Sequence, residues 1–293
     1  LEKKENNSFY FSGKKYSYFN LYIEKNTSFM SFKNGDLDIV TNIEDKKVSD
    51  INKAIIVDKV LTHVEANLGK YQKSKITVSQ VDYDTNPFYG LNQLPSFISP
   101  FPDEFIYELK FLKTFLNNYL KSTLRLDARK DNWIYDGIQV YAMMQYMKEN
   151  YPDHKMTGRI SDFKLFKGFH LLNLDFNEQF SYFYLLMARK NLDQPLGAPK
   201  NTLIKFNEQI ASKYRAGLSF IYLDNYLGNG SVANSIQRFN SKNELEQTTA
   251  NDFETLLKSE TKKDIDWFFK TIINSREIID YKFSDVTKTK DSV

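Results

Sequence analysis

Four polar side chains in the middle of the sequence have the types and spacing of a site shared by two helices. Lys113 and Asn117 are four residues apart, Thr114 lies between them, and Asp136 follows Asn117 after eighteen intervening residues. Residues four apart in a helix share one face. An ammonium and a carboxylate form an ion pair, whereas a tight zinc site needs three or four nitrogen, sulfur or oxygen donors. These side chains are therefore too few in donors to bind zinc tightly. We expect instead that the Lys113 amine lies within about 4 Å of the Asp136 carboxylate. Asn117 can hydrogen-bond to either of the two.

Two predicted helices carry these four side chains. The first begins near Pro102, and its apolar residues recur every three or four positions, as in a helix with one face on a core. These apolar residues are Phe105, Leu109, Leu112, Leu116 and Tyr119. The second helix begins after Asp131, whose side chain can cap it, and runs to about Asn150, ahead of Pro152. The site requires these helices to be adjacent and to face each other.

The first part of the chain is predicted to form strands and one helix. Alternating apolar and polar residues in 16–43, including 18–23, predict strands, with a turn at Gly35. A helix is expected over 48–68 and a strand over 76–81.

The last third of the chain is predicted to be almost entirely helical. Helical spacing continues from about 176 to 274, with breaks at the proline- and glycine-containing segments 194–199 and 228–230. The tail, 286–293, is polar, and we expect it to be flexible.

The composition limits the class of protein. The 293 residues are 41% hydrophobic, with 24 Phe and 19 Tyr, which is ample for a core. The 40 basic and 37 acidic residues give a net charge of only +3, spread along the chain, so we expect no nucleic-acid partner. The absence of cysteine excludes disulfides, cysteine-ligated zinc and thiol catalysis. No apolar run is long enough to span a bilayer, so no membrane-spanning segment is expected in this chain.

Five segments, in the same order along the chain, resemble the catalytic domain of the aminopeptidase N family of gluzincin metallopeptidases. Segment 68–78 is similar to the entry strand of that domain, and 86–95 stands where the family has its substrate-binding strand. Segment 133–137 is similar to the W-x-x-E-G context of the family's third zinc ligand. Segment 213–217 is similar to the start of the helix that carries the transition-state tyrosine, and 248–269 to the family's helical ending.

The resemblance implies a degenerate zinc site. It puts Lys113 and Asn117 at the positions of the two zinc-binding histidines, Thr114 at that of the catalytic glutamate, and Asp136 at that of the third ligand. We therefore expect no catalytic residue, the loss of zinc and no other cofactor. Tyr214 is retained at the position where the family uses a phenol to stabilise the developing oxyanion.

The resemblance also implies a peptide-binding segment beside the site. We expect the segment 88–97 to be an extended edge, because prolines bracket it and an edge offers backbone groups to a peptide strand. The expected peptide-binding residues are Tyr89, Gly90, Leu91, Asn92 and Gln93. Asn92 or Gln93 replaces the glutamate that binds the substrate's amine in the family.

The fold class expected from the resemblance is α+β: a thermolysin-like gluzincin domain with a small mixed sheet and a mainly helical lobe. Residues 1–45 are expected to form strands, either the end of a preceding β region or the edge of this sheet. Residues 46–285 are expected to form the gluzincin-like domain.

The expected function is that of a pseudopeptidase, which binds a peptide or a partner protein, or other domains of a longer chain, through the former active-site cleft. Two alternatives stay open: an active zinc aminopeptidase with a non-standard metal site that includes Asp136, and a purely structural module of a larger envelope protein. Bound metal would distinguish the active aminopeptidase from the pseudopeptidase. Peptide binding in the cleft would distinguish the pseudopeptidase from the structural module. A bacterial source and an extracytoplasmic or cell-envelope location are favoured.

Overall fold

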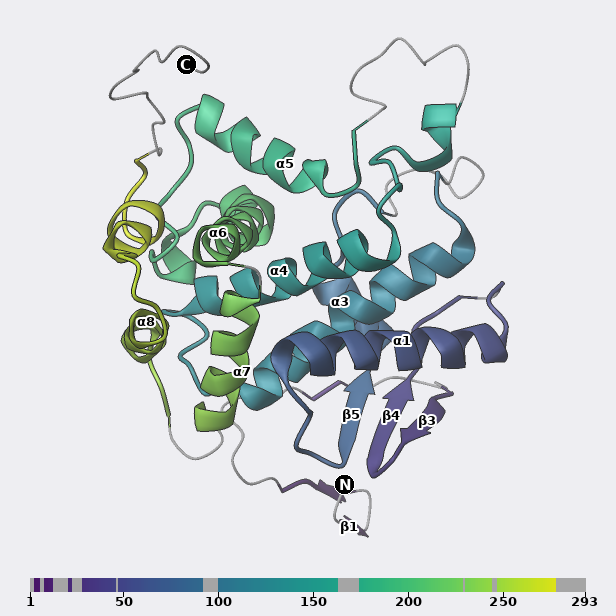
Figure 1. Cartoon of the computed structure of the whole chain (residues 1–293). Helices are drawn as coiled ribbons and strands as arrows, with labels where there is room; N and C mark the ends of the chain where they lie inside the picture. The colour runs from purple at the N-terminus through teal and green to yellow at the C-terminus, as the bar shows by residue number, and fades with distance from the viewer. Residues whose placement is uncertain are drawn as a thin grey trace, which may run out of the picture.

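A computed structural model describes residues 3–5, 8–12, 21–22, 28–45, 47–91, 100–162, 174–228, 230–243 and 247–277. Its described part is a small β-sheet at one end of a larger helical body, shown in Figure 1. The α+β fold class predicted from the sequence is confirmed. The expectations for the tail, 286–293, and for most of the strand at 18–23 fall outside the described residues.

The sheet has the strand order β3-β4-β5. Strands β3 (Met30–Asn34) and β4 (Leu37–Thr41) are antiparallel, and β4 is parallel to β5 (Lys75–Val78). The predicted turn between β3 and β4 is confirmed, and Gly35 there has a φ of +56°, which glycine adopts without strain. Strand β4 lies before residue 46, where the main domain is expected to begin, and β5 lies after it. Because the two strands are paired, the strands at 30–41 belong to the sheet of the main domain. Strands β1 (Lys3–Glu5) and β2 (Ser8–Tyr10) form a separate antiparallel pair.

Helix α1 (Asp50–Leu68) connects β4 to β5, as a parallel pair of strands requires. It begins where Ser49 caps it: the Ser49 hydroxyl accepts a hydrogen bond from the backbone N–H of Asn52, at 3.2 Å. It ends at Gly69, which has a φ of +97°. The predicted helix at 48–68 is therefore confirmed. The strand predicted over 76–81 ends earlier, because Ser79 caps the short helix α2 (Gln80–Thr85).

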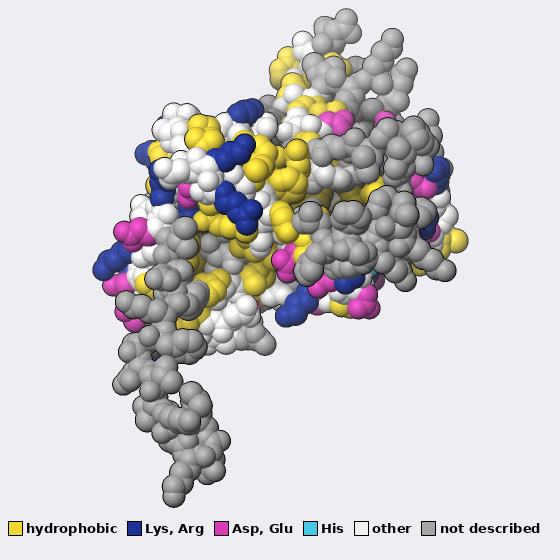
Figure 2. Space-filling view, turned by 90° about the horizontal axis from the view of Figure 1, so that it is seen from above, with side chains coloured by type: hydrophobic (Ala, Val, Ile, Leu, Met, Phe, Trp, Pro, Cys, Tyr) yellow, Lys and Arg dark blue, Asp and Glu magenta, His cyan; other side chains and the backbone are white. Residues whose placement is uncertain are grey.

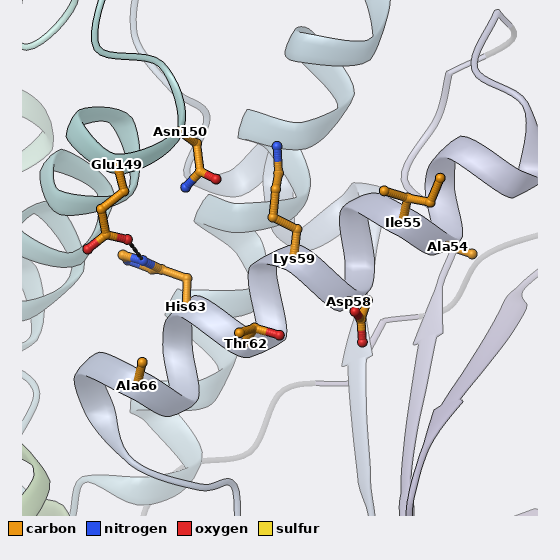
Figure 3. A pocket seen from close by; sticks show the side chains of 9 residues that line it. All are labelled: Ala54, Ile55, Asp58, Lys59, Thr62, His63, Ala66, Glu149 and Asn150. Carbon is orange, nitrogen blue, oxygen red and sulfur yellow. Dashed lines mark hydrogen bonds and ion pairs between the residues drawn. The ribbon is translucent and has the colours of Figure 1, made fainter.

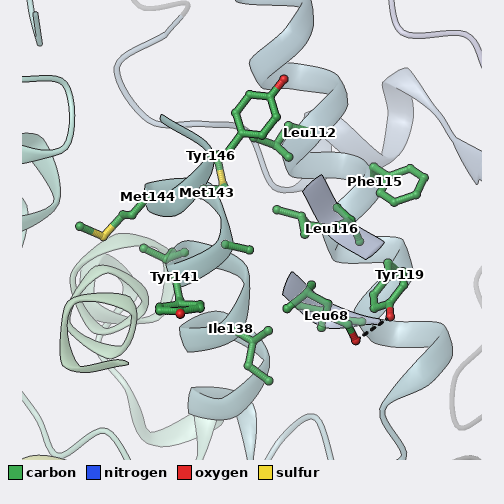
Figure 4. Packing of buried hydrophobic residues seen from close by; sticks show 14 of the residues in the cluster. Leu68, Leu112, Phe115, Leu116, Tyr119, Ile138, Tyr141, Met143, Met144 and Tyr146 are labelled. Atoms are coloured by element: carbon green, nitrogen blue, oxygen red, sulfur yellow. Dashed lines mark hydrogen bonds between the residues drawn. The ribbon is translucent and has the colours of Figure 1, made fainter. Parts of the chain in front are cut away.

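Helices α3 (Asp103–Thr123) and α4 (Asn132–Asn150) form the centre of the helical body. On α3, the rings of Tyr107, Phe111, Phe115 and Tyr119 stack along one face, with centroids 5.9–6.5 Å apart. Figure 4 shows other apolar side chains of α3 and α4, among them Leu112, Leu116, Ile138 and Met143, packed between the two helices. Burial of such side chains contributes roughly 1.5–3 kcal/mol each, so this contact holds the helices adjacent.

Helix α6 (Ser212–Leu227) crosses α4 unusually closely, because both helices have glycine at the contact. A Cβ atom on Gly217 would lie 2.3 Å from Val140 Cγ1, and one on Gly137 would lie 2.5 Å from a ring carbon of Phe220. The π-helical turn η6 (Asn207–Ala211) leads into α6, and α5 (Glu178–Arg189) packs along α6. Close packing of α4 and α6 decides which side chains can meet across them.

The remaining helices complete the body. Helix α7 (Ser231–Asn243) packs against α1 and α6, and α8 (Ala250–Ser259) begins with a capping box between Thr249 and Asp252. The other elements are the 3-10 turns η2 (Gly158–Asp162) and η5 (Lys200–Thr202) and the π-helical turn η7 (Phe268–Ile273). The predicted breaks at 194–199 and 228–230 are confirmed, since neither segment contains a described helical residue.

The glycine contact predicts a position where alanine destabilises a helix. In Gly217→Ala the new methyl group would lie 2.3 Å from Val140 Cγ1. We expect a loss of about 1–3 kcal/mol in the free energy of unfolding, because overpacking outweighs the gain of roughly 1 kcal/mol that alanine brings to a helix. Urea unfolding measures this. Asn234→Ala, at an exposed position of α7, is the control and should change stability by at most about 0.5 kcal/mol. An unchanged midpoint for Gly217→Ala would show that α4 and α6 are not so close.

Candidate functional site

Helices α3 and α4 bring the four predicted side chains to one region of the molecule. Lys113, Thr114 and Asn117 lie on α3, and Asp136 lies in the first turns of α4. The helices are joined at this level, because the Gln139 amide donates a hydrogen bond to the backbone carbonyl of Lys113, at 3.0 Å. The prediction that the two helices are adjacent is therefore confirmed.

The ion-pair partner of Asp136 is Lys213, a residue of α6. Its Nζ lies 3.6 Å from Asp136 Oδ1 and donates a hydrogen bond to Asn86 Oδ1, at 3.1 Å. The Lys213 side chain is 10% exposed and that of Asp136 is 19% exposed. The prediction that Lys113 forms this ion pair is wrong, since no pair within 4.0 Å joins Lys113 to Asp136. The tight crossing of α6 over α4 brings Lys213 to the carboxylate instead.

Lys113 is a largely buried lysine beside a second cation. Only 7% of the residue is exposed, and within the described residues no ion pair or hydrogen bond of its amine is found. Burial and, to a smaller extent, the charge of Lys213 lower the pKa of Lys113 to about 7, against the opposing effect of Asp136. Burial therefore favours the uncharged form of the Lys113 amine at lower pH than for an exposed lysine.

Thr114 and Asn117 make hydrogen bonds that do not include Asp136. The Thr114 hydroxyl donates to the backbone carbonyl of Lys110, one turn earlier in α3, at 2.9 Å. The Asn117 amide donates to the side chain of Asn118, at 3.0 Å, and Asn118 donates in turn to the Thr77 carbonyl of β5. The prediction that Asn117 bonds to the Lys113–Asp136 pair is therefore wrong. Asn117 belongs to a polar contact between α3 and the sheet.

These side chains do not fit a zinc ion. The region offers one carboxylate, Asp136, and two lysine amines, whereas zinc needs three or four donor atoms that are not protonated. Across the described part of the chain, no group of three or more His, Asp or Glu side chains could hold a metal ion.

Tyr214 follows Lys213 on α6 and is buried in an aromatic cluster. Its ring lies 4.7 Å from that of Phe180 and 5.9 Å from that of Phe183, both on α5. Burial raises the pKa of the Tyr214 phenol above its usual range, and the nearby tyrosines Tyr89 and Tyr83 add to this. The phenol therefore stays protonated and can act as a donor.

The segment expected to bind peptides is a turn where the structure describes it. Residues 89–91 form the turn, in which Gly90 has a φ of +92°, and Phe88 and Leu91 are buried in the core. Tyr89 packs against Phe183 with ring centroids 4.8 Å apart. The prediction of an extended edge is therefore wrong for 88–91: burial of two apolar side chains within four residues favours the turn. Asn92 and Gln93 lie outside the described residues.

Sequence reasoning missed Lys213 and Asn86 as site residues. Lys213 directly precedes Tyr214, in the segment that resembles the family's helix start, and this was the signal available. Nothing in the sequence indicated the role of Asn86. By contrast, the neighbouring Arg215 has a structural role, because its guanidinium is buried and donates to the backbone carbonyls of Gln194 and Ser275.

An open pocket of about 640 Å³ lies between α1 and the end of α4 (Figure 3). None of the candidate site residues lines it. His63 is in contact there with Glu149, at 2.7 Å, and with the backbone carbonyl of Ala142. Beneath it, Lys59 pairs with the buried Glu108 at 2.6 Å, and Glu108 also accepts hydrogen bonds from the phenols of two tyrosines of the α4 region. The charged groups satisfy one another, so we interpret this cluster as a connection between α1, α3 and α4.

The outer face of α5 is apolar. Tyr182, Leu185 and Leu186 are each 42–45% exposed, while Phe180 on the opposite face is buried against Tyr214. Figure 2, which views the end of the molecule where α5 lies, shows apolar side chains gathered between lysine and arginine side chains. No helix in the described residues is long and apolar enough to cross a membrane.

Comparisons with known proteins connect this fold to zinc peptidases. No family profile and no curated protein sequence matches the chain. An M1 zinc metallopeptidase from Deinococcus radiodurans has a similar structure, with a TM-score of 0.54 and 13% sequence identity, over 86% of this chain and 51% of that one. A variant of the M1 zinc metallopeptidase from the same organism, bound to a Tyr-Ser-Ala substrate, gives a TM-score of 0.55 at 12% identity, over 86% of this chain and 52% of that one.

A two-domain M1 zinc metallopeptidase variant bound to L-tryptophan gives a TM-score of 0.54 at 13% identity, with 86% and 52% covered. The chain thus spans about half the length of these solved structures. At this level of identity, the similarity shows the fold and does not transfer an activity. The chain therefore has the fold of M1 metallopeptidase domains.

The burial of Lys113 predicts a pH-dependent effect on stability. The folded protein holds the Lys113 pKa near 7, below its ordinary value of 10.5. Burying the charged form therefore costs stability below pH 7, and this cost is relieved as the pH rises from 7 towards 10.5. We expect Lys113→Met to stabilise the protein most below pH 7, by up to several kcal/mol, because each pKa unit corresponds to about 1.4 kcal/mol. The advantage should shrink by pH 10.

Denaturant unfolding of both proteins from pH 6 to pH 10 measures the difference. Lys148→Met, at an exposed position of the same helix pair, is the control and should give a difference that does not change with pH. If the stability difference between Lys113→Met and the unaltered protein is also independent of pH, the Lys113 amine is solvated in the folded protein.

Proposed function

We propose that this chain is a non-catalytic peptidase-like domain that binds a peptide or a partner protein at the region where M1 peptidases bind zinc. One observation carries the proposal. Asp136, which the sequence resemblance puts at the position of the third zinc ligand, is paired with Lys213, and Lys113 lies on the facing helix. A peptidase of this type needs a metal ion to activate water and to polarise the peptide carbonyl, and two lysines oppose the binding of a dication.

The catalytic base position supports the same conclusion. Thr114 has no carboxylate, and its hydroxyl is bonded to the backbone of its own helix. Tyr214, although retained, has its ring against Phe180 and Phe183, and its phenol alone supplies neither a nucleophile nor a base at neutral pH. The active metallopeptidase would require donors that the described residues do not bring together.

Binding of a protein or peptide is supported by the surface around the site. The outer face of α5 exposes Tyr182, Leu185 and Leu186. Exposed apolar groups of this kind mark interaction surfaces in many proteins. The opposite face of α5 covers Tyr214, so a partner on the outer face would lie one helix away from the former active-site region.

The proposal is tested by metal content and activity in one preparation. We expect the purified protein, dialysed against zinc, to retain less than stoichiometric zinc and to cleave no aminopeptidase substrate, while it binds an unstructured peptide mixture in a pull-down with mass-spectrometric readout. Stoichiometric zinc with hydrolysis would establish the metallopeptidase instead. Neither zinc nor any bound peptide or protein would favour a purely structural module.

Restoring the zinc ligands should depend on Lys213. The fourfold variant Lys113→His, Thr114→Glu, Asn117→His and Asp136→Glu supplies the missing donors but leaves an ammonium beside the carboxylate, 3.6 Å away in the unaltered protein. Adding Lys213→Gln removes that competing charge. We expect the fivefold variant to bind zinc at least about tenfold more tightly, since a repulsion of 1.4 kcal/mol is enough for this factor.

Isothermal titration calorimetry with zinc measures both dissociation constants, and Lys148→Gln added to the fourfold variant is the charge-matched control. Equal zinc affinity of the fourfold and fivefold variants would show that Lys213 does not occupy the site.

A further inference from the structure

We propose that the ligand of this region carries a carboxylate, which binds between the amines of Lys113 and Lys213. This inference rests on the proposed function, because it names the ligand chemistry of the same region. Two ammonium groups from different helices, α3 and α6, lie close enough to influence each other, and a single carboxylate, Asp136, lies between the helices that carry them.

The charges at the site leave one cation without a partner. Asp136 is held by Lys213, whose amine also donates to Asn86. Lys113 is 93% buried, and among the described residues its amine has neither an ion pair nor a hydrogen bond. A buried charge that is not paired is costly, and a second carboxylate would remove this cost.

A third lysine lies at the edge of this region. Lys121, two turns further along α3, interacts electrostatically with Asp82 first, and also with Lys200, Lys213 and Asp136. The charged groups of the site are therefore Lys113 from α3, Asp136 from α4 and Lys213 from α6, and Lys121 of α3 has Asp82 of α2 and Lys200 of η5 beside it. In a water-poor environment such a set attracts an anion, and the lysines supply donors that a carboxylate accepts. Solvent reaches the region at the partly exposed Asp136 side chain.

A peptide is the carrier of this carboxylate that fits the fold best, because Phe180 and Phe183 of α5 pack on the neighbouring Tyr214, Tyr89 packs on Phe183, and the outer face of the same helix is apolar. The carboxylate could belong to the C-terminus of the peptide or to an acidic side chain. Both present the same two oxygens to the lysines, so three blocked peptides distinguish them: N-acetyl-tetraalanine with a free C-terminus, its C-terminal amide, and that amide with one alanine replaced by aspartate.

Calorimetric titration of the full chain with these peptides tests the proposal. We expect the carboxylate peptide to bind at least about tenfold more tightly than the neutral amide, as charge-assisted hydrogen bonds exceed neutral ones. If the aspartate peptide matches or exceeds the free C-terminus, the ligand is an acidic side chain; if it binds as weakly as the neutral amide, the ligand is a C-terminus. Equal binding of all three overturns the inference but leaves peptide binding intact. No binding by any of them overturns the inference, whereas the proposed function fails only if the pull-down also recovers no peptide or protein.

The pH dependence tests the role of Lys113. The carboxylate binds the protonated amine, whose pKa in the free protein is about 7. The affinity should therefore be constant below pH 7 and fall by up to about tenfold per pH unit above it. Lys113→Met should weaken carboxylate binding at least about tenfold and remove this pH dependence, and Lys213→Gln should weaken binding as well. Lys148→Met should change neither. A carboxylate affinity that Lys113→Met leaves unchanged would overturn the assignment.

Discussion

The close packing of α4 against α6 is the constraint from which the arrangement of the candidate site follows. Gly137 and Gly217 leave no room for a side chain between the two helices, so that α6 lies directly against the face of α4. This contact places Lys213 beside Asp136. The interface of α4 with α3, filled by apolar side chains on both helices, places the same carboxylate near Lys113. Three helices thus meet at a single acidic residue.

Charge balance at this meeting point distinguishes the chain from the zinc enzymes whose fold it shares. A zinc ion brings two positive charges among ligands that are neutral or negative. Here the positive charges belong to the protein itself, and one of them is buried. In the pair of Lys213 and Asp136 each charge has a partner, whereas the Lys113 amine has no ion pair among the described residues, and burying an unpaired charge costs stability. Local rules of this kind are broken in natural proteins mainly at functional or strained sites, which is the reason for assigning Lys113 to the ligand.

The sequence predicted those features of the fold that depend on residues close together along the chain. The turn at Gly35, the cap of α1 at Ser49 and the end of α1 at Gly69 depend on residues within a few positions. The pairing of Asp136 was not predictable in this way, because Lys113 and Lys213 are a hundred residues apart and only the packing of α6 decides between them. The turn at 88–91 was missed for a related reason: proline spacing indicated an edge, but burial of Phe88 and Leu91 in the tertiary core determines the conformation.

The most direct measurement is an NMR titration of the Lys113 side chain in protein labelled with ¹³C at the lysine ε-carbon, with the resonance assigned by its loss in Lys113→Met. Burial beside Lys213 lowers the pKa of Lys113 to about 7. A midpoint near 7 that moves upward when the carboxylate peptide is added is the result predicted here. A midpoint at the ordinary lysine value of 10.5, unaffected by Lys213→Gln, would contradict the proposed arrangement of charges.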